Sequence, residues 1–315
     1  MNPPIVAFFN NKGAVGKTSL VYHLAWMYFD LGLKVVAADL DPQANLTAAF
    51  MDEERLEEVW EGNSDRNTVF RCVQPLLKGI GDIAIPNLEK IEDGLYLFIG
   101  DLQLSGFEDE LSSQWPACLD GKERAFRVIS AFWRLLTQAA TDSEADIVLV
   151  DLGPNLGAIN RAALIAADYM VVPLSPDLFS LQGLKNLGPT VVRWRQEWQE
   201  RIPKNPAPDF QLPTGQMQPI GYIILQHGVR FDRPVKAFQR WIEQIPTTYH
   251  TKVLQEPANA FTDINRLALI KHYQSLMPMA QESRKPIFHL KPADGAIGAH
   301  LSAVRNVYFD FKELA

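Results

Sequence analysis

Short apolar runs alternate with segments of helical periodicity along the chain. Ile5–Phe9 and Val35–Leu40 contain no helix breakers, as expected for strands that are buried on both faces of a parallel sheet. Between these runs, apolar residues recur at helical spacing from Leu20 to Leu31, and Gly32 stands where a helix would end. The pattern predicts strand, helix and strand, the unit that joins neighbouring strands of a parallel sheet.

The same alternation continues towards the C-terminus. Further strands are predicted at Leu95–Ile99, Ile147–Leu152, Tyr169–Leu174 and Gly221–Leu225, with helices at Arg124–Ala140 and Asn155–Ala167. Alternating strands and helices are typical of a doubly wound, mostly parallel sheet that is flanked by helices. The predicted fold class is therefore α/β, and we expect residues 1–315 to form a single domain.

Four segments do not follow this alternation. Residues 51–91 are predicted to be an insertion or a peripheral helical layer, in which the acidic run Asp52–Glu61 forms a solvated helix face. Residues 202–219 contain five prolines and are predicted to be a surface loop. We expect an additional helix at Asp263–Met277 and a terminal core helix at Leu301–Leu314.

The composition is that of an ordinary globular protein of 315 residues with a net charge of −7. This charge does not favour a protein that is coated with basic residues for nucleic acid, although it leaves room for a local basic patch. The two cysteines, Cys72 and Cys118, have no metal-like spacing. We find neither a membrane-span pattern nor a signal-peptide pattern, so the expected location is the cytoplasm, including association with the nucleoid.

The segment Asn11–Ser19 carries the clearest chemistry, because it reads N-K-G-A-V-G-K-T-S between a predicted strand and a predicted helix. Small residues let consecutive backbone N–H groups surround phosphate oxygens, and the start of the helix adds a partial positive charge. A lysine for the β- and γ-phosphates and a hydroxyl for Mg²⁺ complete a phosphate-binding loop. The residues expected to contact the nucleotide here are Asn11, Lys12, Gly13, Ala14, Val15, Gly16, Lys17, Thr18 and Ser19.

Carboxylates at the ends of two predicted strands complete the expected site. Asp151 ends an apolar strand, and with the Thr18 hydroxyl it provides the hard oxygen ligands that suit Mg²⁺ beside a triphosphate. Gly153 and Pro154 then turn the chain next to the expected γ-phosphate position. A strand-ending aspartate that merely caps the next helix is the alternative reading.

The second acidic segment reads D-L-D-P-Q-A-N from Asp39 to Asn45. Pro42 favours a turn that gives the two acids different surroundings. We expect Asp39 to support the metal shell and Asp41 to position the attacking water, with Asn45 as a further polar contact. A simple Asp-Pro turn is the alternative.

Together, N-K-G-A-V-G-K-T, D-L-D-P-Q-A-N and the later V-D-L-G-P-N-L-G resemble the ParA/MinD family of deviant Walker-A ATPases, and most closely its ParA-type partition branch. The segments Gly94–Glu108, Asn155–Leu187 and Arg284–Phe288 are also similar to that family. The resemblance implies a P-loop domain that forms a homodimer around two ATP molecules, with Lys12 reaching into the partner's site. Lys12, Lys17 and Asp41 are the implied catalytic residues, and ATP and Mg²⁺ the implied cofactors.

The resemblance also implies a switch that positions a plasmid, a chromosome region or other cargo. The ATP-bound dimer would bind non-specific DNA, and a ParB-like or adaptor partner would stimulate hydrolysis. Two alternatives are a nucleotide-gated regulatory or scaffold module with little ATPase activity and a MinD-like membrane-positioning ATPase. We do not expect a membrane partner, because the C-terminal segment carries little basic charge.

The sequence departs from the family pattern at three places. One is Gly153, which stands where a proline is usual after the strand-ending Asp151, and we expect little consequence from it. Ala14 stands where the family usually has its second glycine, and a methyl group fits there only if the backbone does not need a positive φ. The P-R-N motif that often precedes the C-terminal segment is missing, and Pro257–Asn259 is its nearest match.

Arg233, Lys236 and Arg240 are expected on one face of a helix that Pro234 opens. They form either a stripe for the DNA backbone or the solvated side of an amphipathic helix. A looser basic region lies beside Trp194 and Trp198, which are predicted to pack in the core. Its members are Arg193, Arg195, Arg201 and Lys204.

Overall fold

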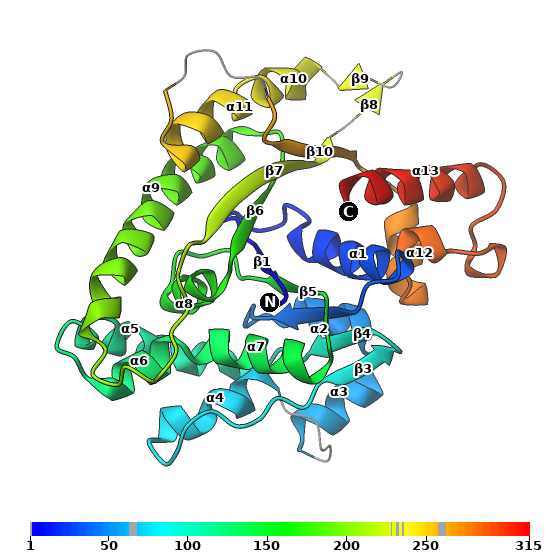
Figure 1. The fold of residues 1–315 in the computed structure, drawn as a ribbon. Coiled ribbons are helices and arrows are strands. Elements are labelled where there is room, and N and C mark those ends of the chain that lie inside the picture. Colours follow the sequence, from blue (N-terminus) through cyan, green and yellow to red (C-terminus); the bar gives the residue numbers. More distant parts are fainter. Residues whose placement is uncertain (1, 63–67, 228, 231–232, 235, 258–262) are drawn as a thin grey trace.

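A single sheet of eight strands organises the molecule (Figure 1). The computed structural model describes residues 2–62, 68–227, 229–230, 233–234, 236–257 and 263–315, and within 226–237 it describes the backbone alone. The strand order is β10-β7-β6-β1-β5-β2-β4-β3, with all neighbours parallel except the pair β3–β4. The predicted α/β class is confirmed. The strands are β1 (Ile5–Phe8), β2 (Val35–Asp39), β3 (Glu89–Glu92), β4 (Leu95–Phe98), β5 (Ile147–Asp151), β6 (Tyr169–Leu174), β7 (Gln218–His227) and β10 (Arg266–Lys271).

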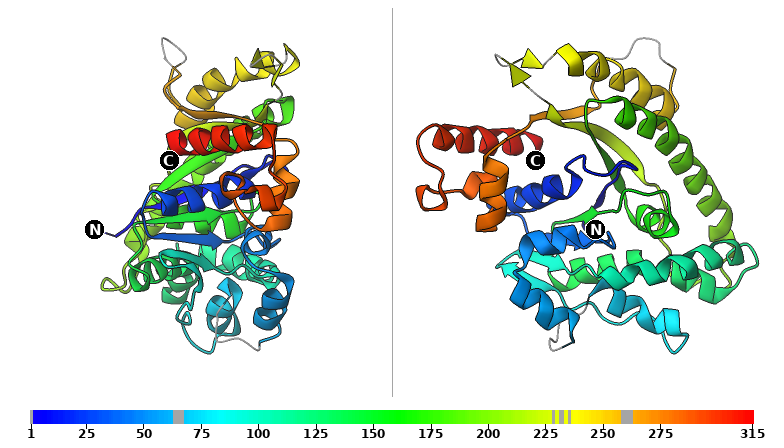
Figure 2. Two further views of the ribbon diagram at one scale, coloured as in Figure 1. Left: turned by 90° about the vertical axis from the view of Figure 1, so that its right-hand side faces the viewer. Right: turned by 180° about the vertical axis from the view of Figure 1, so that it is seen from behind.

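The central strand β1 divides two hydrophobic cores. Ile5 and Ala7 face one core, whereas Val6 and Phe8 face the other, as the period of two requires. One layer consists of α1 (Lys17–Asp30), α2 (Asn45–Phe50), α3 (Glu53–Trp60), α12 (Leu276–Ser283) and α13 (Ala299–Leu314). The opposite layer consists of α4 (Val69–Lys78), α5 (Glu108–Ala117), α6 (Glu123–Ile129), α7 (Ala131–Asp142), α8 (Ala158–Ala166), α9 (Leu178–Arg201) and α11 (Ile245–Thr248). Figure 2 shows these two layers on either side of the sheet.

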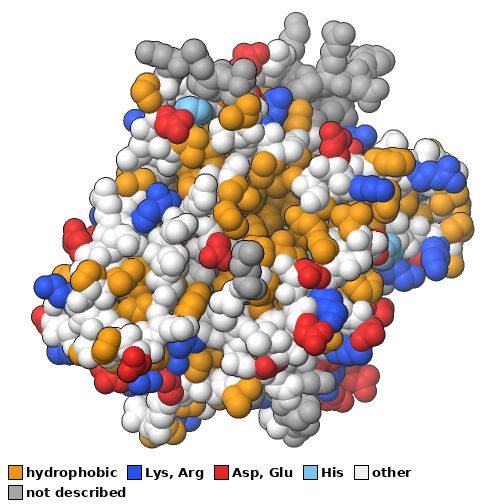
Figure 3. Space-filling view, in the orientation of Figure 1, with side chains coloured by type: hydrophobic (Ala, Val, Ile, Leu, Met, Phe, Trp, Pro, Cys, Tyr) orange, Lys and Arg blue, Asp and Glu red, His pale blue; other side chains and the backbone are white. Residues whose placement is uncertain are grey.

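Both ends of the chain lie on the face that Figure 1 presents. In the same orientation, Figure 3 shows apolar side chains gathered in the middle of this face, with charged side chains around its rim. Strand β1 begins here, so the loop that follows it lies on the far side of the molecule, as the left view of Figure 2 shows. The carboxyl edge of the sheet, where the predicted site residues lie, therefore faces away from the viewer in Figure 1.

Two predicted helices differ from the structure. The segment 124–140 is divided at Ser130, whose backbone (φ −86°, ψ 1°) leaves the helical region. The Phe126 oxygen accepts from both the hydroxyl (2.6 Å) and the N–H (3.0 Å) of Ser130. The helix predicted at Asp263–Met277 is wrong, because strand β10 occupies its middle and α12 begins only at Leu276. Periodicity alone cannot assign so short an apolar run, and the pairing of β10 with β7 decides it.

Arg233, Lys236 and Arg240, which were expected on one helix face, are arranged differently in the structure. Arg233 lies in the two-residue strand β9 (Arg233–Pro234), which pairs with β8 (Val229–Arg230), whereas Lys236 begins α10 (Lys236–Ile242). The three cations therefore do not share one helix. Arg240 is exposed, and its guanidinium lies 4.3 Å from the ring centre of Trp241. Most of the P-R-N counterpart, Ala258–Asn259, lies outside the described residues.

The structure also tests the predictions for the two tryptophans, the terminal helix and Arg201. The prediction that Trp194 and Trp198 pack in the core is confirmed, since both are buried, and Leu301–Leu314 lies within α13. Arg201 does not belong to a surface patch, because it is buried and donates to the backbone oxygens of Trp115 (3.0 Å) and Glu197 (2.7 Å). In the described parts of the chain, no helix is both long enough and apolar enough to span a membrane.

Residues 51–91 and the proline-rich segment, two of the four segments that do not follow the predicted alternation, have distinct structures. Residues 51–91 contain α3 and α4, an irregular stretch and the start of the antiparallel edge strand β3. Asp52 and Thr68 cap the two helices by accepting backbone N–H bonds from Arg55 (2.8 Å) and Arg71 (3.2 Å). Residues 202–217 form one turn of 3₁₀-helix at Ile202–Lys204 and an irregular segment before β7.

Candidate active site

The loop between β1 and α1 has the backbone geometry that a bound phosphate requires. Gly16 has φ 88°, a left-handed conformation that favours glycine, and it directly precedes Lys17, the first residue of α1. Val15 is buried and anchors the middle of the loop. The Gly16 oxygen accepts from the Leu20 N–H (2.9 Å), so helical bonding begins there and leaves the preceding N–H groups for an anion.

Ala14 is a strained position in this loop. Its φ of 58° lies in the left-handed region, where an L-residue with a side chain costs about 1–2 kcal/mol. A methyl group would fit here without strain only if the backbone did not need a positive φ. This condition is not met. Ala14 is exposed, so the strain has a conformational rather than a packing origin.

Asp151, at the end of β5, contacts both the lysine and the hydroxyl of the loop. Its carboxylate accepts from Lys17 Nζ (2.8 Å) and from the Thr18 hydroxyl (2.7 Å), and it is fully buried. Burial raises the pKa of Asp151, whereas the charge of Lys17 opposes this rise. A hydroxyl and a carboxylate side by side at a phosphate loop are hard oxygen donors, so Thr18 and Asp151 fit Mg²⁺.

Asp39 and Asp41 have different surroundings. Asp39 is fully buried, and its Oδ2 accepts from both the backbone N–H and the hydroxyl of Thr47 (2.8 Å each). Burial and the neighbouring charge of Asp151 raise the pKa of Asp39. Asp41 instead faces the cavity over the loop, and its Oδ1 accepts from the Gln43 N–H (3.0 Å). If Asp39 supports the metal shell, it therefore does so indirectly, through Asp151, its neighbour on β5.

A cavity of about 530 Å³ lies over the loop. Among the predicted residues, Lys12, Gly13, Ala14, Val15, Gly16, Lys17, Thr18, Ser19, Asp41, Asn45 and Pro154 line it, whereas Asn11, Asp39 and Asp151 do not. Sequence reasoning missed Tyr22, His23, Gln43, Ala48, Ala49, Met277, Ala280, Gln281 and Lys285. Gln43 lies inside the D-L-D-P-Q-A-N segment and could have been found there, but no sequence signal identified the residues of α12.

Lys12 contacts a carboxylate that sequence reasoning also missed. Its Nζ forms an ion pair with Asp177, and both side chains are partly exposed. Asp177 also caps α9, because its Oδ1 accepts from the Ser180 N–H (2.8 Å). An aspartate directly before an apolar helix is a recognisable cap signal, although nothing in the sequence pairs it with Lys12.

The AAA_31 family profile, which describes an AAA domain, matches residues 4–204, more than half of the chain. This chain belongs to the ParA/MinD family of P-loop ATPases. The match contains the phosphate-binding loop, both acidic segments and Asp177, but it ends before the last third of the chain.

Relatives and solved structures agree with this family. The chain is 32% identical to the cell division protein PomZ of Myxococcus xanthus over 58% of this chain and 50% of PomZ. It is 27% identical to the sporulation initiation inhibitor protein Soj of Bacillus subtilis over 59% of this chain and 64% of Soj. The chain thus spans about half to two thirds of these curated relatives.

Among solved structures, protein DIP2308 of Corynebacterium diphtheriae has a TM-score of 0.72 at 27% identity, covering 89% of this chain and 97% of that one. The ATP complex of McdA(D38A) from Cyanothece has a TM-score of 0.63 at 16% identity, covering 99% and 96%, and therefore shows the fold alone.

In this ParA/MinD-family protein, His23 connects α1 to the C-terminal segment. Its Nδ1 lies 2.7 Å from the Ser19 oxygen, and its Nε2 accepts from the Ile287 N–H (3.1 Å). Both bonds are satisfied by a neutral ring with the proton on Nδ1. Burial lowers the pKa of His23 to about 4.

The buried His23 predicts a pH dependence of stability. Between pH 6.5 and 4, His23 becomes protonated in the unfolded chain but stays neutral in the folded chain. The free energy of unfolding therefore decreases as the pH falls. The total loss is about 3 kcal/mol, since one unit of pKa corresponds to about 1.36 kcal/mol. Urea unfolding of wild type and His23→Gln from pH 7 to pH 4 should show their difference in unfolding free energy shrinking by this amount. His272→Gln, which removes an exposed histidine, is the control, and a difference that stays constant would contradict the prediction.

Proposed function

We propose that this protein is a Mg²⁺-dependent ATPase that works as a dimerisation switch. ATP joins two copies of the chain, Lys12 of each copy contacts the nucleotide of the other, and hydrolysis separates them. The observation that carries this proposal is the arrangement of Lys17, Thr18 and Asp151 beneath a cavity whose rim holds Lys12.

The residues of the site have different roles at the triphosphate. The loop N–H groups and Lys17 bind and orient the phosphates, and Thr18 and Asp151 would hold Mg²⁺. When bound, Mg²⁺ neutralises charge on the phosphate oxygens. Asp41, which faces the cavity, orients the attacking water, while Asn45 and Pro154 border the γ-phosphate position.

The partly exposed position of Lys12 supports a role across an interface. Its ammonium lies at the carboxyl edge of the sheet and is paired with Asp177 of its own chain. A cation that is donated between subunits stabilises charge only when both subunits and the γ-phosphate are present. Such a residue therefore couples dimerisation to nucleotide state and to hydrolysis.

The family relationship supports a role in positioning cargo. PomZ is named a cell division protein, and a solved neighbour from Borrelia burgdorferi B31 is a putative plasmid partition protein bound to AMPPNP. For this chain we propose partition or positioning of a plasmid, chromosome or other cargo in the cytoplasm or at the nucleoid. A ParB-like or adaptor protein would stimulate hydrolysis.

For DNA binding we propose the region of β9 and α10. Arg233 in β9 and Lys236 and Arg240 in α10 lie close together in the sequence, and Arg240 is exposed. Three cations in this region would bind DNA phosphates without reading the bases, as a carrier that moves over DNA requires.

The switch is tested by Lys12→Ala. We expect this variant to bind ATP as a monomer but to lose ATP-dependent dimerisation and turnover, because the cross-subunit cation is removed. Lys17→Ala should instead lose ATP binding itself. Sedimentation velocity with ATP, ADP or no nucleotide, together with phosphate release, measures both effects. Lys185→Ala on the exposed side of α9 is the control. Dimerisation and hydrolysis of Lys12→Ala at the wild-type level would refute the role of Lys12.

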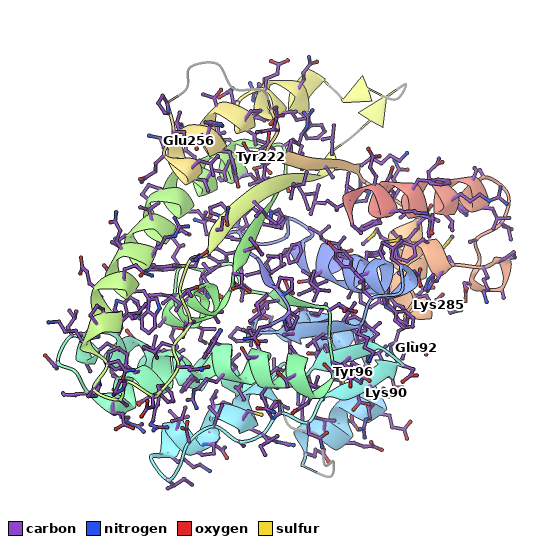
Figure 4. All side chains as sticks on the ribbon, viewed as in Figure 1. Lys90, Glu92, Tyr96, Tyr222, Glu256 and Lys285 are labelled. Atoms are coloured by element: carbon purple, nitrogen blue, oxygen red, sulfur yellow. The ribbon has the colours of Figure 1, made fainter. Side chains whose placement is uncertain are left out.

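DNA binding is tested by the double variant Lys236→Ala/Arg240→Ala. Each lost phosphate contact should lower the slope of log affinity against log salt by about one, so the slope should fall by about two. The control is Lys90→Ala on β3, at the opposite edge of the sheet (Figure 4). Fluorescence anisotropy with duplex DNA and ATP at several salt concentrations measures the slope. An unchanged slope would place the DNA surface elsewhere.

A further inference from the structure

The turn that follows β5 lies against two parts of the proposed active site. Pro154 lines the cavity over the phosphate loop, and its Cγ is 4.0 Å from the point where a Cβ on Gly13 would stand. The neighbouring Gly153 lies against Asp41, because a Cβ on Gly153 would be 3.2 Å from Oδ1 of Asp41. The position of this turn therefore determines what surrounds the γ-phosphate and the attacking water in the proposed reaction.

The amide of Asn160 on α8 holds the start of the turn. Asn160 is only 1% exposed, and its Nδ2 donates to the backbone oxygens of Gly153 (2.9 Å) and Asn155 (2.7 Å). The same nitrogen donates to Oδ1 of Asn155 (3.1 Å). With the amide reversed, Oδ1 of Asn160 would face these three oxygens, so only the observed orientation gives them a donor.

The other end of the Asn160 amide shows what this side chain contributes. Among the residues that the structure describes, Oδ1 of Asn160 is buried and has no hydrogen-bond partner. A buried acceptor without a donor costs free energy, which an apolar side chain of similar size would avoid. The contribution specific to asparagine at this position is therefore its pair of N–H donors to the turn.

Glu108, the first residue of α5, holds the other end of the turn. Helices α5 and α8 pack against each other in one layer (Figure 1). The Glu108 carboxylate accepts from the first backbone N–H groups of α8, those of Ala158 (2.5 Å) and Ile159 (2.9 Å). A negative charge is stabilised there by the free N–H groups and by the helix dipole. Gly157 leaves room for this contact, because a Cβ there would lie 2.6 Å from Oε1 of Glu108.

We propose that Asn160 and Glu108 are positioning residues for hydrolysis, which hold the turn from Gly153 to Gly157 against Asp41 and the γ-phosphate position. This inference rests on the proposed ATPase function. Neither Asn160 nor Glu108 lines the cavity, so both act through the turn. Since ADP lacks the γ-phosphate, the turn contributes to the turnover of ATP and much less to the binding of ADP.

The test is Asn160→Asp, which keeps the size and shape of the side chain but removes both N–H donors. Without these donors the turn is no longer held at Asp41. We expect kcat for ATP to fall by about tenfold, because a small displacement near the reacting atoms is costly, while the affinity for ADP stays within about twofold of wild type. Phosphate release at saturating ATP measures kcat, and calorimetry with Mg²⁺ and ADP measures the affinity.

The matched control is Ile165→Val, near the far end of the same helix. Ile165 is fully buried in the core and makes no contact with the turn through hydrogen bonds, so this variant loosens the packing of α8 alone. Its kcat and its affinity for ADP should both equal those of wild type. A fall of kcat in Ile165→Val as large as that in Asn160→Asp would overturn the positioning role, because the loss would then follow the packing of α8.

The remaining outcomes separate this inference from the proposed function. A wild-type protein that releases no phosphate from ATP would refute the ATPase, and this inference with it. Wild-type turnover with an unchanged kcat in Asn160→Asp would overturn the positioning role and leave the ATPase proposal intact. A loss of ADP affinity as large as the loss of kcat would do the same, because the variant would then have damaged the whole site.

Glu108→Gln tests the other end of the turn and replaces Asn160→Asp if that variant does not fold. It removes the charge and keeps one acceptor oxygen for the N–H groups of α8. We expect a smaller fall of kcat than in Asn160→Asp, again with the affinity for ADP unchanged. A kcat equal to that of wild type in Glu108→Gln would contradict the role of Glu108.

Discussion

A lysine and an aspartate, both buried, meet 2.8 Å apart where β5 ends and α1 begins. Neither charge could be buried alone without a large desolvation cost, so each requires the other. The register of the sheet makes this possible, because Phe8 of β1 lies opposite Asp151 of β5 and sets the loop beside the carboxylate. The Thr18 hydroxyl donates to the same carboxylate (2.7 Å). The position of α1 depends on this junction, and so do the phosphate binding and the metal binding that we propose.

Three separate parts of the chain complete the site around this pair. The centre of the sheet provides the loop and the carboxylates, and the start of α9 provides Asp177 for Lys12. In the C-terminal segment, α12 contributes Met277, Ala280 and Gln281 to the lining of the cavity. In the dimer that we propose, Lys12 must leave Asp177 to reach the neighbouring subunit, whereas Lys17 stays with the nucleotide of its own chain. Nucleotide binding and dimerisation can therefore be disrupted separately.

The parts of the site that are local in sequence could be predicted, and those that depend on long-range packing could not. The loop, Asp151 and the parallel sheet follow from residue types at fixed spacing between apolar runs. By contrast, Lys12 and Asp177 are 165 residues apart, and His23 and Ile287 are 264 apart. The burial of Asp39 against Thr47 depends on how the chain turns after β2, which the motif does not specify. Strand β10 was misread because its pairing with β7, rather than its own pattern, makes it a strand.

The most direct test of the central claim is complementation between two inactive variants. In our account, a complete site uses Asp41 of one subunit and Lys12 of the other. Lys12→Ala and Asp41→Ala should each hydrolyse ATP poorly alone, but their mixture contains heterodimers with one complete site. We predict that the mixture releases phosphate clearly faster than the sum of its components, with a rate that depends on the mixing ratio. A mixture that shows only the summed rate of the two variants would contradict the exchange of Lys12 between subunits.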